Sequence, residues 1–201
     1  MIWTLPNGLT LGRILAAPVV CLLLLQGEPW ADRWAFVVFA LAAVTDFLDG
    51  WLARLLQQTS DLGRMLDPIA DKVMVLLVLA VLFAEPGNQS WGFAVPALLI
   101  MMREVLVSGL REFLGDVKLA VTRLAKWKTT AQLFALGLWL ASDPLLFIEG
   151  KSAPLDQHWI GFGDLLEGLA YLMIWIAAGL TVLTGLDYFR KGITHIQRWE
   201  G

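Results

Sequence analysis

The sequence has very few of the residues that staple small secreted proteins or bind nucleic acids. Cys21 is the only cysteine among 201 residues, which excludes a disulfide scaffold. Charged residues make up 16% of the chain, against about 25% in ordinary soluble domains. The net charge of −3 leaves no basic surplus to neutralise phosphates, so we expect no nucleic acid partner.

Apolar side chains are present in excess. Hydrophobic residues make up 58% of the chain, and the mean hydropathy is +0.67. This much apolar material excludes a disordered chain and predicts an all-α, polytopic membrane protein. Because a spanning helix needs about 20 residues, six transmembrane helices would use roughly 120 and leave only short loops. Residues 1–201 are therefore expected to form a single membrane domain.

Turn residues divide the chain into six expected spans. Their ranges are Leu9–Gln26, Asp32–Leu55, Leu66–Ala84, Trp91–Phe113, Lys126–Ser142 and Leu165–Tyr188. If the N-terminus is cytoplasmic, every Lys and Arg except Arg33 and Lys151 falls on the inner side or in the inner half. This follows the positive-inside rule and predicts that both termini face the cytoplasm.

Four aspartates interrupt the second and third expected spans near their cytoplasmic ends. Asp46 and Asp49 share a helix face because they are three residues apart, and Asp67 and Asp71 share one at four residues. Charged side chains in spans are costly and usually functional. Since the intervening loop is short, we expect the two helices to be antiparallel neighbours that bring the four carboxylates together.

Carboxylates gathered in a poorly solvated cleft repel one another unless some take up protons or bind cations. An all-oxygen set without His or Cys suits Mg²⁺ or Mn²⁺, and four carboxylates suit two ions better than one. A simpler interpretation makes the aspartates solvated helix ends, with Asp67 as an N-cap before Pro68. Gly50 and Ala53, on the Asp46 stripe, either admit a flat ligand group or serve helix packing.

The spacing of these residues resembles the signature of the CDP-alcohol phosphatidyltransferase family. The matching positions are Asp46, Asp49, Gly50, Ala53, Arg54, Gly63, Asp67 and Asp71. The resemblance implies a six-span membrane enzyme, usually a homodimer, that transfers a phosphoryl-linked group from a CDP-alcohol to a second alcohol and releases CMP. It also implies that Asp46, Asp49, Asp67 and Asp71 border two metal ions, and that Asp71 is the general base.

Other segments are similar to the bacterial phosphatidylglycerophosphate synthases, a branch of that family. They are Pro6 to Arg13, Arg103-Glu104, Arg111-Glu112 and Lys126 to Gln132. This similarity implies that CDP-diacylglycerol reacts with glycerol 3-phosphate at the cytoplasmic face of a bacterial inner membrane. The residues expected to contact CDP-diacylglycerol are Gly50, Ala53, Arg54, Gly63, Asn7 and Thr10.

Basic residues of the fourth and fifth expected spans form a second candidate site. Arg103 and Arg111 share a helix face within about 80°, and Lys126 and Lys128 begin the next span. Together these four could clamp the phosphate of glycerol 3-phosphate. Alternatively, Arg103 forms a structural ion pair with Glu104 or Glu112, and the other three only follow the positive-inside bias.

Three other functions are alternatives to this reaction. A cardiolipin synthase of the same family would take phosphatidylglycerol as its acceptor. A cation transporter could use the aspartates as an ion path, but transporter sites lie near the bilayer midplane and these carboxylates gather near one face. A non-catalytic assembly factor would have no use for four aspartates at this spacing.

Overall fold

A computed structural model describes residues 5–55, 61–85, 88–114, 123–142 and 157–200. The helices are α1 (Leu5–Leu24), α2 (Pro29–Leu55), α3 (Asp61–Ala84), α4 (Trp91–Leu114), α5 (Arg123–Ala141) and α6 (Gln157–Glu200). The described residues contain no strand, so the prediction of an all-helical chain is confirmed for them.

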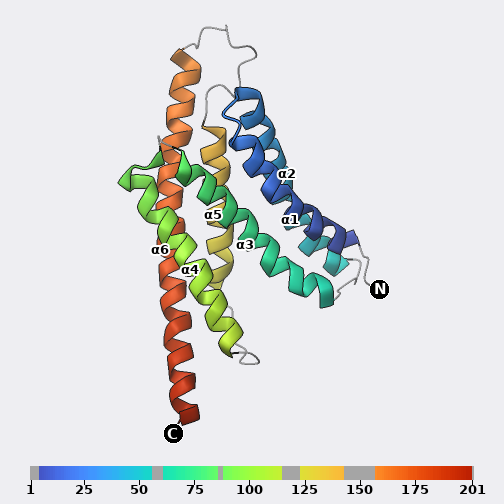
Figure 1. Ribbon diagram of the computed structural model, residues 1–201, viewed down its shortest axis with the longest axis vertical. Helices are drawn as coiled ribbons and strands as arrows, with labels where there is room; N and C mark the ends of the chain where they lie inside the picture. Colours follow the sequence, from blue (N-terminus) through green and yellow to red (C-terminus); the bar gives the residue numbers. More distant parts are fainter. Residues whose placement is uncertain (1–4, 56–60, 86–87, 115–122, 143–156, 201) are drawn as a thin grey trace.

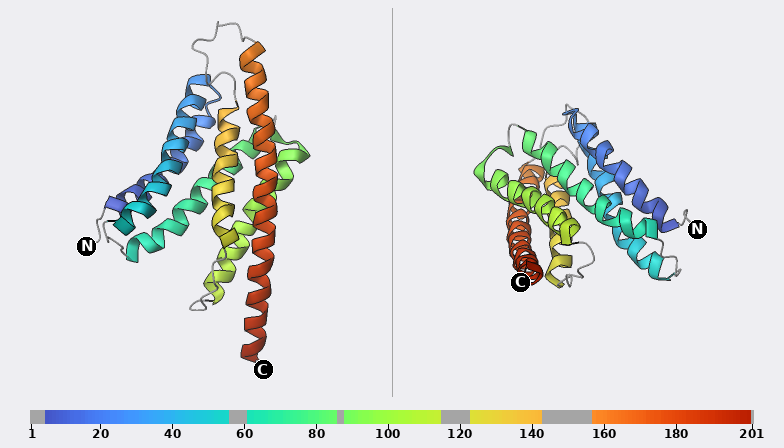
Figure 2. Two further views of the ribbon diagram at one scale, coloured as in Figure 1. Left: turned by 180° about the vertical axis from the view of Figure 1, so that it is seen from behind. Right: turned by 60° about the horizontal axis from the view of Figure 1, so that its bottom comes forward.

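The six helices form two groups of three, each arranged around one helix (Figures 1 and 2). In the first group α1 packs against α2 and α3, and in the second α6 packs against α4 and α5. The groups meet where α2 contacts α5 and where α3 contacts α4 and α5. One buried apolar cluster extends through both groups and includes Phe39, Leu79, Phe93 and Leu136.

The arrangement of α2 and α3 differs from the sequence prediction. They run in opposite directions, as expected (Figures 1 and 2). Along the described residues, however, α1 makes the extensive contacts with both of them, and α2 and α3 touch each other little. The buried side of α1 carries Ala17 and Val20, whose side chains are fully buried. Small residues on that side let α1 approach both neighbours closely.

Within the described ranges, three helices have the length and composition needed to cross a bilayer. The apolar segments are Asn7–Leu24 of α1, Trp91–Leu114 of α4 and Phe162–His195 of α6. Large apolar side chains also cover much of the outer surface, including Leu15, Leu41 and Leu183, each at least 60% exposed. So extensive an apolar surface suits lipid better than water. The passage of α2, α3 and α5 through the membrane stays a prediction.

The last helix, α6, extends well beyond its predicted range. α6 has 44 residues, where the sequence predicted Leu165–Tyr188, and it continues past the other helices to the C-terminal end (Figure 1). At 1.5 Å per residue it is about 66 Å long, twice the hydrocarbon core of a bilayer. Its C-terminal part is polar and carries an Asp187–Lys191 ion pair at 2.6 Å. Such a pair, four residues apart, supports a helix in water.

The interpretation of Asp67 as an N-cap is wrong. α3 begins at Asp61, so Asp67 and Pro68 lie inside the helix rather than at its start. A proline in this position removes one backbone hydrogen bond. Because Asp67 does not cap α3, its carboxylate can accept hydrogen bonds from other helices.

Candidate active site

A buried polar face on α1 lies toward the carboxylates of α2 and α3. Asn7, Thr10 and Arg13 follow one another at intervals of three residues, so they lie along one side of the helix. All three are buried, with Thr10 only 1% exposed and Arg13 only 4% exposed. Burying a guanidinium is costly unless it is paired. The contacts of Arg13 therefore show which groups this polar face of α1 binds.

Arg13 joins two of the predicted metal ligands. Its Nη1 forms an ion pair with Asp46 of α2 and lies 2.8 Å from Oδ1 of Asp71 on α3. One turn earlier, the hydroxyl of Thr10 donates a 2.9 Å hydrogen bond to Oδ1 of Asp67. The structure thus gathers Asp46, Asp67 and Asp71 around α1, which lies between the two helices that carry them.

Several other predicted site residues have side chains outside the described part of the structure. They are Asp49, Gly50, Ala53 and Arg54 of the signature, on α2, and Lys126 of the basic cluster, on α5. Their backbone is helical, which preserves the predicted face-sharing of Asp46 and Asp49. Gly63 is buried in the first turn of α3.

The carboxylates have the chemistry of a divalent cation site. Among the described side chains, no three His, Cys, Asp or Glu converge closely enough to hold a metal ion. Asp46 and Asp71 nevertheless converge on one positive group, the Nη1 of Arg13. Their oxygens, with those of Asp67, are the hard donors that Mg²⁺ and Mn²⁺ prefer. These residues therefore have the donor chemistry that the predicted ions need, and the metal site itself stays a prediction.

A cavity of about 430 Å³ opens beside these carboxylates. Its charged lining residues are Asp46, Asp67, Asp71, Lys72, Arg103, Glu104, Arg111 and Lys128. The acidic groups from α2 and α3 lie on one side, and the basic groups come mainly from α4 and α5. The volume falls in the range of small-molecule sites. The cavity therefore brings together residues of both sites that the sequence predicts.

A buried glutamate holds part of the basic wall in place. Lys128 forms an ion pair with Oε1 of Glu104, and Nη1 of Arg103 lies 3.4 Å from the same oxygen. Arg103 also donates a 3.1 Å hydrogen bond to Thr184 of α6. The structural ion pair considered as an alternative is therefore present, and it involves Glu104 rather than Glu112. Since Arg103 and Lys128 share one carboxylate, the group keeps a positive charge at the cavity.

Tyr188 connects the two arginines. The Nη2 of Arg111 donates a 2.6 Å hydrogen bond to the Tyr188 hydroxyl, and its guanidinium carbon lies 4.8 Å from the ring centroid. The guanidinium carbon of Arg103 lies 5.7 Å from the same centroid. Both distances are within the range of cation–π attraction. Tyr188 thus orders two cations along one wall.

Comparison with known proteins decides the family. A family model described as CDP-alcohol phosphatidyltransferase matches residues 3–183. The chain belongs to this family. The resemblance inferred from the spacing of the aspartates is thereby confirmed, and the chain is a phosphatidyltransferase.

Relatives of the phosphatidyltransferase are similar to it in sequence over nearly its full length. The CDP-diacylglycerol–glycerol-3-phosphate 3-phosphatidyltransferase of Cereibacter sphaeroides is 44% identical over 98% of this chain and 99% of its own. The enzyme of the same name from Rickettsia typhi is 39% identical over 95% of this chain and 98% of its own. A rice protein named cardiolipin synthase (CMP-forming) is 36% identical over 94% of this chain but only 57% of its own.

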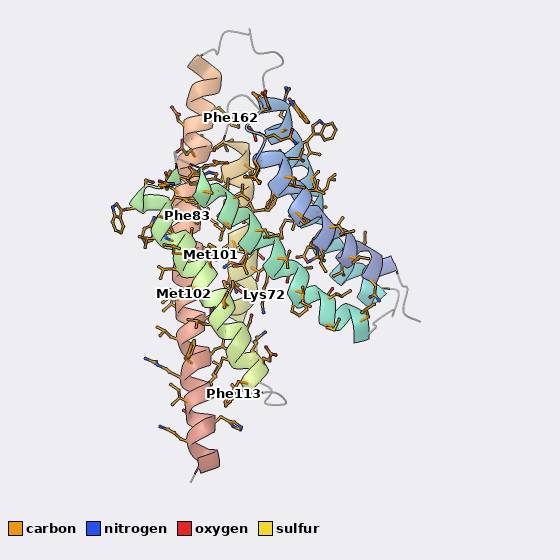
Figure 3. The ribbon with its side chains drawn as sticks, viewed as in Figure 1. Lys72, Phe83, Met101, Met102, Phe113 and Phe162 are labelled. Carbon is orange, nitrogen blue, oxygen red and sulfur yellow. The ribbon has the colours of Figure 1, made fainter. Side chains whose placement is uncertain are left out.

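The structure also adds residues that sequence reasoning missed in this phosphatidyltransferase. Arg13 was part of a similar segment and stood out as a charge within an apolar stretch, but no role in the site was predicted for it. A lone charge in an apolar helix is itself a signal. Lys72 lines the cavity and donates a hydrogen bond to the hydroxyl of Ser108 on α4. It lies where α3 passes α4 (Figure 3). Tyr188 gave no signal, because nothing in the sixth expected span showed which helix it faces.

Proposed function

We propose that this phosphatidyltransferase transfers the phosphatidyl group of CDP-diacylglycerol to sn-glycerol 3-phosphate, giving phosphatidylglycerophosphate and CMP. The observation that carries the proposal is the cavity with one acidic side and one basic side. A metal-bound diphosphate suits the acidic side, and a free phosphate monoester suits the basic side. The names of the Cereibacter and Rickettsia relatives support the same reaction.

The acidic side is proposed to bind the donor. Asp46, Asp49, Asp67 and Asp71 would hold two Mg²⁺ or Mn²⁺ ions, which when bound neutralise the diphosphate and the departing CMP oxygen. The proposed donor contacts are Gly50, Ala53, Arg54, Gly63, Asn7 and Thr10. Of these, Thr10 donates a hydrogen bond to a proposed metal ligand, Asp67. It would therefore act by fixing that carboxylate as well as by lying near the donor.

Asp71 is proposed as the general base. Its carboxylate lines the cavity and faces Arg13, which fixes one of its oxygens. A base must lie within hydrogen-bond reach of the hydroxyl that it deprotonates. Asp71 is the aspartate of α3 nearer to Lys72, the point where the acidic side gives way to the basic one. An acceptor held by its phosphate could present its hydroxyl there.

The basic side is proposed to bind the phosphate of the acceptor through Arg103, Arg111, Lys126 and Lys128. Arg103 and Arg111 are already ordered by Tyr188, which lowers the entropy cost of forming a phosphate site. Guanidinium groups match phosphate oxygens in a two-point geometry. Lys72 lines the same cavity and adds another cation.

Cardiolipin synthesis is the alternative, supported by the 36% identity to the rice protein. In that reaction phosphatidylglycerol would be the acceptor, and its reacting end is a neutral glycerol group. A basic wall has no evident use for a neutral alcohol, whereas it matches the dianion of glycerol 3-phosphate. The charges of Arg103, Arg111 and Lys128 at the cavity therefore favour glycerol 3-phosphate.

The protein is proposed to be a multi-pass protein of the bacterial inner membrane, with the cavity facing the cytoplasm. The Lys and Arg distribution supports this orientation. A water-soluble acceptor and a lipid donor could both reach a site at that interface. A homodimer is proposed from the family resemblance alone, and mass photometry of the detergent-solubilised protein would test it.

An acceptor-exchange assay tests the reaction. Purified protein is incubated with CDP-diacylglycerol, Mg²⁺ or Mn²⁺, and either glycerol 3-phosphate or phosphatidylglycerol, and the release of CMP is measured. We expect release with glycerol 3-phosphate that a chelator abolishes. If CMP were released with phosphatidylglycerol and not with glycerol 3-phosphate, the proposal would be rejected in favour of cardiolipin synthesis.

A further inference from the structure

One face of α6 carries small and polar residues that are buried against its neighbours. Thr181, Thr184, Gly185 and Tyr188 occupy positions i, i+3, i+4 and i+7, so they share one side of the helix. All four are buried, and α6 packs extensively against α4 and α5. Because Tyr188 also lines the charged cavity, this face of α6 reaches the proposed acceptor site.

The side chain of Arg103 lies directly against the backbone of Gly185. A Cβ built at Gly185 would come within 3.1 Å of Cγ of Arg103 and 3.5 Å of its Nε. Non-bonded carbon atoms are normally about 3.5–4.0 Å apart, so the first contact would be too close. The stem of Arg103 therefore occupies space that exists only because residue 185 has no side chain.

Arg103 is held by hydrogen bonds at its tip and by packing along its stem. Its Nη1 lies 3.4 Å from Oε1 of Glu104, and its Nη2 donates a 3.1 Å hydrogen bond to the hydroxyl of Thr184. The Nε is buried, and no residue in the described ranges accepts a hydrogen bond from it. The contact with Gly185 therefore decides the path of the stem, and Thr184 fixes the tip that this path delivers to the cavity.

We propose that Gly185 and Thr184 are positioning residues that set the affinity for the acceptor phosphate through Arg103. Gly185 lets the stem of Arg103 lie close to α6, and Thr184 accepts a hydrogen bond from its guanidinium. A methyl group at position 185 would displace the stem and move the guanidinium away from Glu104 and Thr184. The inference rests on the proposed function, in which Arg103 binds the phosphate of glycerol 3-phosphate.

Gly192 provides a matched control on the same pair of helices. It lies on α6 two turns after Gly185, and it is also buried. A Cβ built there would lie 3.1 Å from Cδ1 of Leu110 on α4, as close as the contact at Gly185. Leu110 does not line the charged cavity, and the end of its side chain can rotate away. Gly192→Ala therefore adds the same methyl group between α4 and α6 without displacing Arg103.

Steady-state CMP release over a range of glycerol 3-phosphate concentrations tests the role of Gly185. We expect Gly185→Ala to raise the KM for glycerol 3-phosphate about tenfold, the effect of misplacing one charged hydrogen bond to the ligand. The kcat and the KM for CDP-diacylglycerol should change less than about twofold, because Arg103 lies on the basic side of the cavity. Gly192→Ala should match the wild type in all three constants. A Gly185→Ala variant that behaves like Gly192→Ala would overturn the proposal.

A double-mutant cycle shows whether Gly185 acts through Arg103. Arg103→Ala removes both the guanidinium and the stem that a Cβ at position 185 would meet, and Glu104 keeps its ion pair with Lys128. In this background Gly185→Ala should change the KM for glycerol 3-phosphate by less than about twofold, since residues that act as one unit are not additive. If the two substitutions instead raise the KM by factors that multiply, Gly185 does not act through Arg103 and the proposal fails.

Thr184→Val tests the same role without adding bulk. The substitution keeps the shape of the side chain but removes the acceptor of the Arg103 hydrogen bond. It should raise the KM for glycerol 3-phosphate severalfold, and Thr184→Ser, which retains the hydroxyl, should restore the wild-type value. A wild-type KM in Thr184→Val would contradict the positioning of Arg103 by α6, even if Gly185→Ala does not fold.

A binding measurement separates this inference from the proposed function. Isothermal titration calorimetry of the detergent-solubilised protein with inorganic phosphate measures the anion site without turnover. We expect Gly185→Ala to bind phosphate about tenfold more weakly than the wild type and Gly192→Ala do. Equal phosphate affinity in all three proteins would overturn the positioning role alone. Failure of glycerol 3-phosphate to support CMP release by the wild type would instead overturn the proposed function.

Discussion

Arg13 and Asp71 lie 58 positions apart in the sequence, and their side chains meet at 2.8 Å between α1 and α3. The same guanidinium contacts Asp46 of α2, so one cation joins carboxylates from two helices. The side chain of Arg13 is 3% exposed, whereas those of Asp46 and Asp71 are 31% and 37% exposed. The arginine is thus an internal support, and the carboxylates remain accessible from the cavity.

Arg13→Lys should reduce kcat/KM by about tenfold or more, equivalent to about 1.4 kcal/mol of transition-state stabilisation. A lysine keeps the charge but lacks the planar, multi-donor geometry that contacts both carboxylates. The measurement is steady-state CMP release over a range of Mg²⁺ concentrations. Arg33→Lys, an arginine outside the cavity on α2, serves as the control and should be silent. Wild-type kinetics in Arg13→Lys would show that the bridge has no catalytic consequence.

Thr10→Val should raise the Mg²⁺ concentration needed for half-maximal activity. The substitution keeps the shape of the side chain but removes the 2.9 Å hydrogen bond to Asp67. A hydrogen bond to a charged group contributes about 1.5–3 kcal/mol, so the proposed metal ligand would be less well ordered. Thr10→Ser retains the hydroxyl and should restore the metal response. If the serine and valine variants respond alike, the hydroxyl does not position Asp67.

Asp71→Asn should bind CDP-diacylglycerol but lose turnover. The amide is nearly the same size as the carboxylate but cannot accept the proton of the attacking hydroxyl. Donor binding is measured by equilibrium binding of CDP-diacylglycerol in detergent micelles, and turnover by CMP release. Near-normal CMP release would remove Asp71 as the base.

Glu104→Gln separates the two roles considered for the basic residues. Breaking a buried pair by removing one partner costs about 3–5 kcal/mol, so the variant should unfold at a lower temperature. The double variant Glu104→Gln, Lys128→Met removes the unpaired lysine and should recover much of that stability. The double variant should nevertheless have a higher KM for glycerol 3-phosphate than the wild type, because Lys128, a proposed contact of the phosphate, is missing. A double variant with wild-type KM would make Lys128 purely structural.

The sequence predicted the features that depend on the geometry of a single helix. The spacing of Asp46, Asp49, Asp67 and Asp71 depends only on helical periodicity, and it led to the family that the comparisons confirm. It did not predict the features that depend on which helices are neighbours. Periodicity places Asp67 and Asp71 on one face of α3, but it does not show that α1 lies between α3 and α2.

The ends of the helices could not be predicted from the expected spans, for a related reason. The expected spans were drawn to the thickness of a bilayer, and an α-helix does not have to end where the membrane ends. α3 starts at Asp61 and α6 continues to Glu200, because polar residues continue both helices into water. Tyr188 was consequently placed at the end of a helix, although it lies well inside α6 and contacts Arg103 and Arg111.

The central claim is that one cavity holds the metal ions beside its carboxylates and the acceptor phosphate beside its arginines. Phosphorus NMR of glycerol 3-phosphate, with the enzyme in excess over Mn²⁺, tests it most directly, since bound Mn²⁺ accelerates relaxation only of nearby nuclei. We predict strong relaxation enhancement that is lost in Asp46→Asn and in Arg111→Met. Glycerol 3-phosphate that binds the enzyme without enhanced relaxation would contradict the account.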